Sequence, residues 1–293
     1  MLFPLPVIVG APRSGTTLLR LMMDAHPDLA IPPETGFLAL SSSWLKSQEM
    51  SPENFIDMIS GFPADAPTWP DFGIDKEAFL QILGQKKDFD IATGIRSFYR
   101  TYANRFNKPR YGDKTPTYCF HITSIHELLP ETRFIHLIRD GRDVALSWRK
   151  TWFAPDQSIS VLAQAWKRHI ESVREQSQLN SVPVLEICYE SLISEPRLTL
   201  QKICDYIELP YSNQMLDYHK RAALRLVEHG PRFDCKGSLL VSQDQRFNQQ
   251  RLTLIPPSIS RIGGWRREMS ATELQEFEEN AGDLLNELSY PRK

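Results

Sequence analysis

The sequence predicts an α/β fold of three layers, with a central parallel β-sheet flanked by helices. Short apolar runs with the length of buried strands alternate with longer segments of helical periodicity. A glycine-rich turn joins the first apolar run to a helical pattern, and the run at 134–138 also leads through a turn into a helical pattern. We see no internal repeat and no low-complexity linker, so residues 1–293 are predicted to form a single domain.

The first elements follow from local signals. Residues 4–9 form the first expected strand, and residues 16–25 the first expected helix. Ser51-Pro52 is a helix start, since serine caps a helix and proline suits its first turn. Asp75 is a second N-cap. Residues 37–110 are therefore expected to be a helical insertion, rich in aromatic residues.

The later elements are read in the same way. We expect a strand at 134–138 with a helix after it to about 152, a helix at 159–175, a strand at 183–188 and a helix at about 196–207. Residues 232–264 are polar and are predicted to be a loop. Ser270 and Glu273 form a capping box that opens the final helix.

Composition excludes several classes of protein. A net charge of −2 over 293 residues argues against a basic coat for nucleic acid, so no nucleic-acid partner is expected. No apolar stretch approaches the roughly 20 residues of a membrane span, and the N-terminus lacks the basic start of a signal peptide. The four cysteines have no C-x-x-C spacing and are expected to be reduced and mostly buried. These features favour a cytoplasmic protein, and they leave its oligomeric state open.

The first turn has the glycine spacing of a phosphate-binding loop, so the fold is expected to be P-loop-like. Gly10 and Gly15 match G-x-x-x-x-G-K-[ST], but Thr16 replaces the lysine. Backbone N–H groups at such a turn attract phosphate without any side-chain charge. Arg13 adds a cation, and Thr16 and Thr17 add hydroxyl groups. Loss of the lysine argues against a triphosphate-using kinase and favours a nucleotide whose single 5′-phosphate carries another group.

A second anion site is expected where the strand at 134–138 ends. Arg139 lies at its carboxyl end, the edge where open α/β sheets bind ligands. Ser147 follows two helical turns later on roughly the same face, so the two side chains could clamp a second phosphate. One alternative is a Walker B strand that holds Mg²⁺ through Asp140, although Arg139 is a poor neighbour for a cation. Another is a surface turn in which Arg139 pairs with an acid.

The stretches 10–18 and 138–147 together resemble the two signature motifs of the sulfotransferase family, whose donor is 3′-phosphoadenosine 5′-phosphosulfate (PAPS). The resemblance implies sulfuryl transfer without a metal, with 3′-phosphoadenosine 5′-phosphate (PAP) as the product. It also implies that the 5′-phosphosulfate is held by Arg13, Ser14, Gly15, Thr16, Thr17 and Leu18. Arg139 and Ser147 would hold the 3′-phosphate.

Two further stretches agree with this family. Residues 187–192 resemble its strand-ending Tyr-Glu-x-Leu, which implies that Tyr189 lies near the nucleotide, although a core tyrosine is an alternative. Residues 262–266 resemble the segment that closes over the nucleotide, which implies that the loop at 232–264 covers the nucleotide or the acceptor. The resemblance also implies that the insertion at 37–110 contributes to the acceptor site. Relatives often carry a basic residue where Gly264 stands. The closing cation is therefore left open among four residues: Arg261, Arg266, Arg246 and Arg251.

The stretch from Asp24 to Thr35 resembles protein-tyrosine sulfotransferases and their bacterial relatives, which implies that Glu34 is the general base. A solvated loop carboxylate is one alternative to that role. A histidine base is another, with His121 and His126 in the right third of the chain. The same branch implies that Lys114, between Gly112 and Pro116, stabilises the leaving oxygen. Its alternative is a surface lysine paired with Asp113.

The function expected from these residues is a PAPS-dependent sulfotransferase. It would act by in-line displacement on a hydroxyl or amine acceptor, which could belong to a small molecule, a lipid, a sugar or a peptide. Two alternatives remain at this stage: a nucleotide or nucleoside kinase on the same loop, and a catalytically inactive nucleotide-binding module. The acceptor is not identified by the sequence.

Overall fold

A computed structural model describes residues 3–46, 50–86, 88–155 and 157–291. Its central sheet has four parallel strands in the order β4-β1-β5-β6. These strands are β1 (Leu5–Val9), β4 (Asp113–Lys114), β5 (Thr132–Ile138) and β6 (Val184–Cys188). The expected parallel sheet is confirmed. Strand β4 was not predicted, because it is two residues long and has no apolar run of its own.

Short strands form two small additional sheets. β2 (Leu29–Ala30) pairs in parallel with β3 (Arg110–Tyr111). β7 (Arg232–Phe233) pairs antiparallel with β8 (Leu239–Val241). The helices in the first half of the chain are α1 (Thr16–Asp24), α2 (Ser41–Trp44), α3 (Pro52–Ser60), α4 (Lys76–Gly84), α5 (Ile91–Asn104) and α6 (Ile122–Leu128). Those in the second half are α7 (Gly141–Trp148), α8 (Ile159–Asn180), α9 (Tyr189–Ser194), α10 (Pro196–Tyr206), α11 (His219–Leu226), α12 (Gln243–Gln250), α13 (Trp265–Glu268) and α14 (Ala271–Glu287).

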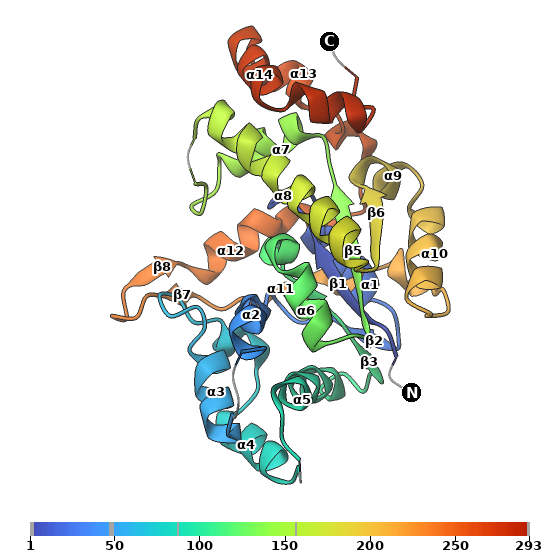
Figure 1. The fold of residues 1–293 in the computed structure, drawn as a ribbon. Helices are drawn as coiled ribbons and strands as arrows, with labels where there is room; N and C mark the ends of the chain where they lie inside the picture. Colours follow the sequence, from blue (N-terminus) through green and yellow to red (C-terminus); the bar gives the residue numbers. More distant parts are fainter. Residues whose placement is uncertain (1–2, 47–49, 87, 156, 292–293) are drawn as a thin grey trace.

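Three layers arise because alternate side chains of a strand point to opposite faces of the sheet. Val7 and Val9 of β1 belong to a buried cluster with residues of α5, α6 and α8. Ile8 belongs to a second cluster with residues of α1, α9 and α10. Helices therefore cover both faces of the sheet, as the sequence predicts (Figure 1).

The insertion at 37–110 has its own aromatic core. Phe98 of α5 lies at its centre, in edge-on contact with Phe37 (5.1 Å between ring centroids) and Phe72 (5.0 Å). Helices α3, α4 and α5 gather at one end of the molecule, and α14 lies at the other (Figure 1). Ser51 and Asp75 cap α3 and α4 as expected.

The segment 232–264 differs from the expected loop. It contains the β7–β8 hairpin and the eight-residue helix α12, which begins at a capping box of Ser242 and Gln245. Helix α12 buries no residue, so it lacks the apolar periodicity by which helices are recognised. Two cysteines also differ from expectation. All four are free, but Cys188 and Cys235 are exposed. None of the described helices is long and apolar enough to cross a membrane.

Candidate active site

The turn between β1 and α1 is shaped by left-handed backbone. Arg13 has φ 72° and Gly15 has φ 100°. A Cβ atom on Gly15 would lie 2.5 Å from the ring of Tyr189, so only glycine lets the turn pack against this tyrosine. Helix α1 begins at Thr16, and no side chain caps it within the described residues. Its first backbone N–H groups are therefore available to an anion.

This turn opens into a cavity of about 840 Å³. The cavity gathers most of the residues that the sequence singled out. Those that line it are Arg13, Gly15, Thr16, Thr17, Leu18, Glu34, Lys114, Arg139, Ser147, Tyr189 and Arg261, together with the alternatives Arg246 and Arg251. Residues far apart in the chain thus face one space, because β1 lies between β4 and β5 and their carboxyl ends meet at the same edge.

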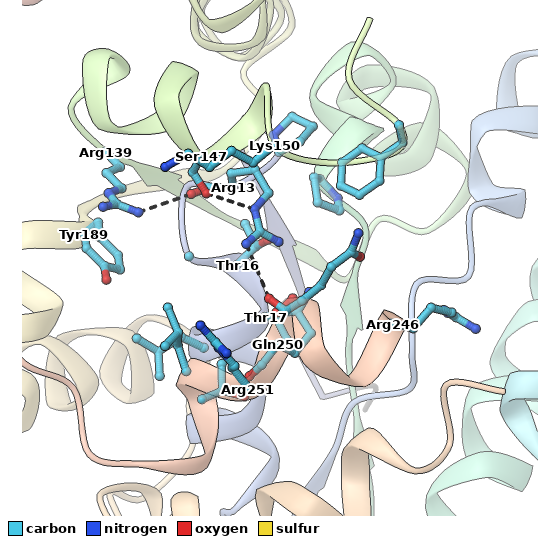
Figure 2. Close-up of a pocket in the computed structure, with 18 of the residues that line it drawn as sticks. Arg13, Thr16, Thr17, Arg139, Ser147, Lys150, Tyr189, Arg246, Gln250 and Arg251 are labelled. Atoms are coloured by element: carbon cyan, nitrogen blue, oxygen red, sulfur yellow. Dashed lines mark hydrogen bonds between the residues drawn. The ribbon is translucent and has the colours of Figure 1, made fainter. Parts of the chain in front are cut away.

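Arg139 and Tyr189 form one end of the cavity. The Arg139 guanidinium lies over the Tyr189 ring at 4.4 Å from its centroid (Figure 2). It donates to the carbonyl oxygen of Arg261 (3.1 Å) and to Oδ2 of Asp143 (3.5 Å), while its Nε is buried without a partner among the described residues. Arg139 therefore pairs with an acidic residue, Asp143, as one of the alternatives from the sequence stated. We call Arg139, Ser147, Tyr189 and Arg261 the nucleotide end.

Arg13 connects three segments of the site. Its Nε donates to Oγ of Ser147 (3.2 Å), and its Nη2 donates to the carbonyl oxygen of Gln249 in α12 (3.4 Å) (Figure 2). Burial and the neighbouring Arg139 lower the pKa of Arg13, and the carboxylate of Glu34 opposes them. Two close arginines with few carboxylates make this region strongly attractive to anions.

Lys114 and Glu34 form a second group in the lining of the cavity. Nζ of Lys114 donates a hydrogen bond to Oε1 of Glu34. The lysine side chain is 2% exposed and the glutamate side chain 51%. Burial lowers the pKa of Lys114, and the ion pair with Glu34 opposes this shift. Lys114 is thus a buried cation paired with Glu34, rather than a surface lysine paired with Asp113.

Neighbouring buried residues fix this pair in place. Oγ1 of Thr35 donates to Oδ2 of Asp113 (2.6 Å), which also accepts a hydrogen bond from the Tyr99 hydroxyl (2.8 Å). Burial raises the pKa of Asp113. Because Thr35 follows Glu34 and Asp113 precedes Lys114, this hydrogen bond ties the two backbone segments together.

Four predicted residues are not in the lining of the cavity. Ser14 is buried, and its Oγ has no partner among the described residues, but it does not line the space. Arg266 stacks on Trp265 at 4.6 Å from the ring centroid instead of facing the nucleotide end. His121 and His126 also lie outside the lining, and His126 is bonded to Oγ1 of Thr132 (2.9 Å).

Three residues of the site were missed by sequence reasoning. His229 and Arg267 line the cavity, and Asp143 both lines it and holds the segment before α13. His229 follows α11 outside any recognisable motif. The signal for Asp143 was within reach, because it lies in the same turn and helix as Arg139 and Ser147.

The Walker B alternative finds no support. Asp140 accepts hydrogen bonds from Nε (3.0 Å) and Nη2 (2.8 Å) of Arg142, and it does not line the cavity. Within the described ranges, no three His, Cys, Asp or Glu residues group in a way that could hold a metal ion.

Fold and site together define a class. A parallel sheet that carries a lysine-free phosphate loop, with an arginine cluster at the end of the adjacent strand, is a site for a nucleotide that is anionic at two places. The family is then given by comparison: the sequence profile described as "Sulfotransferase family" matches residues 4–213. The chain belongs to the sulfotransferase family and is a PAPS-dependent sulfotransferase.

Individual relatives agree with this assignment. The chain is 29% identical over 226 residues to "Protein-tyrosine sulfotransferase" of Drosophila melanogaster, an alignment that covers 74% of this chain but only 40% of that protein. It is 25% identical over 310 residues to "Nodulation protein NoeE" of Sinorhizobium fredii (strain NBRC 101917 / NGR234), which covers 98% of this chain and 67% of that protein. The solved "Sulfotransferase Domain from the Curacin Biosynthetic Pathway" shares the fold, with a TM-score of 0.63, 19% identity and coverage of 100% of this chain and 99% of that one.

Proposed function

We propose that this enzyme transfers the sulfuryl group of PAPS to a hydroxyl acceptor, with Glu34 as general base and Lys114 as the cation at the leaving oxygen. One observation carries the proposal: the Glu34–Lys114 pair lies in the same cavity as the phosphate loop and the Arg139 cluster. A base and a fixed cation beside an anion site are what an in-line transfer to a hydroxyl requires.

The described residues fit the donor. Among the described residues, Ser14 Oγ and Arg139 Nε are buried polar atoms without partners, and no side chain caps the first N–H groups of α1. The loop from Arg13 to Leu18 would hold the 5′-phosphosulfate, and Arg139 and Ser147 the 3′-phosphate. Tyr189 and Arg261 complete this end, and Arg251 lies in the covering segment at 232–264.

The donor supplies an activated sulfuryl group, and the chain supplies position and charge. Glu34 accepts the proton of the acceptor hydroxyl while that oxygen bonds to sulfur. Lys114 donates a hydrogen bond to the bridging oxygen, which leaves with PAP. Arg13 adds positive charge beside it, and no step requires a metal.

The acceptor is expected to enter at the Glu34 end. Pro63, Ala66 and Thr68 of the insertion line the cavity, which supports a contribution of residues 37–110 to the acceptor site. The acceptor class remains the broad one expected from the sequence: a small-molecule, lipid, sugar or peptide hydroxyl.

Calorimetric titration tests the donor. PAP is expected to bind tightly, MgATP weakly, and Arg139→Ala to weaken PAP binding by about tenfold or more, the effect of losing a charge-assisted hydrogen bond. Arg168→Ala, which removes an exposed arginine of α8, is the matched control. Binding of MgATP in preference to PAP would support the kinase alternative. Tight PAP binding without transfer to any acceptor would support the inactive module.

A further inference from the structure

His229 is a largely buried histidine that lines the cavity. Its exposed fraction is 9%, and its ring makes no hydrogen bond to any described residue. The ring nitrogens are not among the fully buried polar atoms, so they remain open to a hydrogen-bonding group of a ligand in the cavity.

The position of His229 in the cavity is on the acceptor side. The charged groups that act on its ring are Arg20, Arg246, Lys114 and Arg232. Lys114 is the partner of Glu34, and Glu34 also acts on Arg232. Those that act on Tyr189 at the nucleotide end form a separate set, led by Arg139 and Arg261. His229 therefore belongs with Glu34 and Lys114, where the acceptor reacts.

The ring is neutral. Burial lowers its pKa well below the ordinary value, and the surrounding cations lower it further. A neutral imidazole has one N–H donor and one nitrogen acceptor. It is a poor base next to Glu34, but it can exchange hydrogen bonds with a hydroxyl, ether or amide group.

The backbone at His229 is rigidly held. Glu228 accepts hydrogen bonds from Arg225 Nη1 (2.6 Å), from the Tyr102 hydroxyl (2.9 Å) and from Arg20 Nη2 (3.3 Å). On the other side, the carbonyl oxygen of Gly230 accepts from Arg246 Nη1 (2.6 Å). A side chain between two such anchors is fixed well enough to select a ligand by geometry.

We propose that His229 determines acceptor specificity by hydrogen-bonding a second polar group of the acceptor, next to the hydroxyl that Glu34 deprotonates. The acceptor class is then a hydroxyl compound with a neighbouring hydrogen-bonding group, such as a vicinal diol or a hydroxy ether. A plain apolar alcohol lacks the second contact. This inference rests on the proposed function.

The test compares two probes that differ by one hydroxyl group, phenol and catechol, as acceptors from radiolabelled PAPS. The wild type is expected to favour catechol by about tenfold in kcat/KM, as one well-placed hydrogen bond allows. His229→Phe is expected to reduce catechol to the level of phenol and to leave the phenol rate within about threefold. His229→Gln, which keeps a donor and an acceptor, is expected to retain part of the preference.

Controls separate the possible outcomes. His219→Phe changes a half-buried histidine of α11 outside the cavity and is expected to keep the preference. An unchanged preference in His229→Phe, or an equal loss with both probes, would overturn the inference. Failure of the wild type to bind PAP would instead reject the proposed donor. If PAP binds and neither probe reacts, the ¹⁵N chemical shifts of the His229 ring in the PAP complex test the inference. Catechol is expected to change these shifts and phenol is not, and any other result would overturn the inference.

Discussion

The carboxylate of Asp143 accepts a hydrogen bond from the backbone N–H of Trp265 over 2.8 Å. Its other oxygen accepts the N–H of Gly263 over 2.9 Å. A helix of the second anion site therefore holds the segment that carries Arg261 and Arg267. Replacing Asp143 by Ala is expected to lower the free energy of unfolding by about 3 kcal/mol, since two hydrogen bonds to a buried charge are lost. Hydrogen exchange at 263–265 should rise; protection equal to the wild type would contradict the role.

Glu34→Gln is expected to lower kcat by roughly 10²-fold or more, because general base catalysis contributes that much. PAP affinity should stay close to the wild-type value, since the ion-pair partner of Glu34 is Lys114 and not Arg139. Single-turnover transfer and calorimetry measure the two quantities. The matched control is Glu127→Gln, an exposed glutamate of α6. A near-normal kcat in Glu34→Gln would reject the base assignment.

Lys114→Ala is expected to lower kcat by about 10²- to 10³-fold, the usual effect of removing a donor at a developing negative charge. The KM for PAPS should change much less, because the interaction is strongest in the transition state. Steady-state kinetics with varied PAPS check this. Lys202→Ala, at an exposed lysine of α10, should behave as the wild type. If the KM for PAPS rises by 10²- to 10³-fold and kcat is unchanged, Lys114 contributes to binding only.

Gly15→Ala is expected to destabilise the phosphate loop, since its φ of 100° is unfavourable for alanine and the new Cβ would lie 2.5 Å from the Tyr189 ring. The cost is on the order of 1–3 kcal/mol. Tyr189→Ala in the same chain removes the steric overlap but not the backbone strain. Denaturant unfolding should show that the double variant loses less stability than the sum of the losses in the two single variants. Simple additivity would mean that the turn and Tyr189 do not press against each other.

Stability is expected to fall as the pH drops below about 6.5, the ordinary histidine pKa. Burial lowers the pKa of His169 to about 4, and it also lowers those of His136 and His229. The unfolded chain binds these protons first, so each group costs up to about 1.4 kcal/mol per pH unit between its unfolded and folded pKa. Urea unfolding at pH 7.5, 6.0 and 5.0 measures the slope. His169→Phe should make it shallower, and a flat profile would contradict the prediction.

The turn between β1 and α1 was predictable, because strand, glycine turn and helix are local patterns. The same holds for Arg139 and Ser147, because Arg139 directly follows β5 and Ser147 lies in α7, the helix that comes next. Arg266 shows where this reasoning fails. Its neighbour Trp265 offers a ring on which it stacks, so the side chain turns away from the cavity. Which of several nearby cations faces a site depends on packing that no local pattern contains.

The segments around β4, α12 and His229 were harder to predict from the sequence. Strand β4 is too short for a periodic signal, and it forms only because it pairs with β1. Helix α12 has no fully buried residue, so its pattern resembles that of a loop. The position of His229 depends on the ion pairs of its neighbour Glu228. One of these ion pairs joins Glu228 to Arg20, which lies 208 positions earlier in the chain. Contacts of that range are invisible to spacing.

Asp71 in the insertion binds two arginines of the distant covering segment, with Oδ2 at 2.8 Å from Nη2 of both Arg232 and Arg246. The insertion and the segment at 232–246 therefore share one buried carboxylate. Suppose that residues 37–110 alone are replaced by the corresponding segment of a related enzyme, in order to change acceptor preference. Arg232 and Arg246 then lose Asp71 as their counter-ion. The transplant has to include residues 232–246 as well, so the two segments form one exchangeable unit.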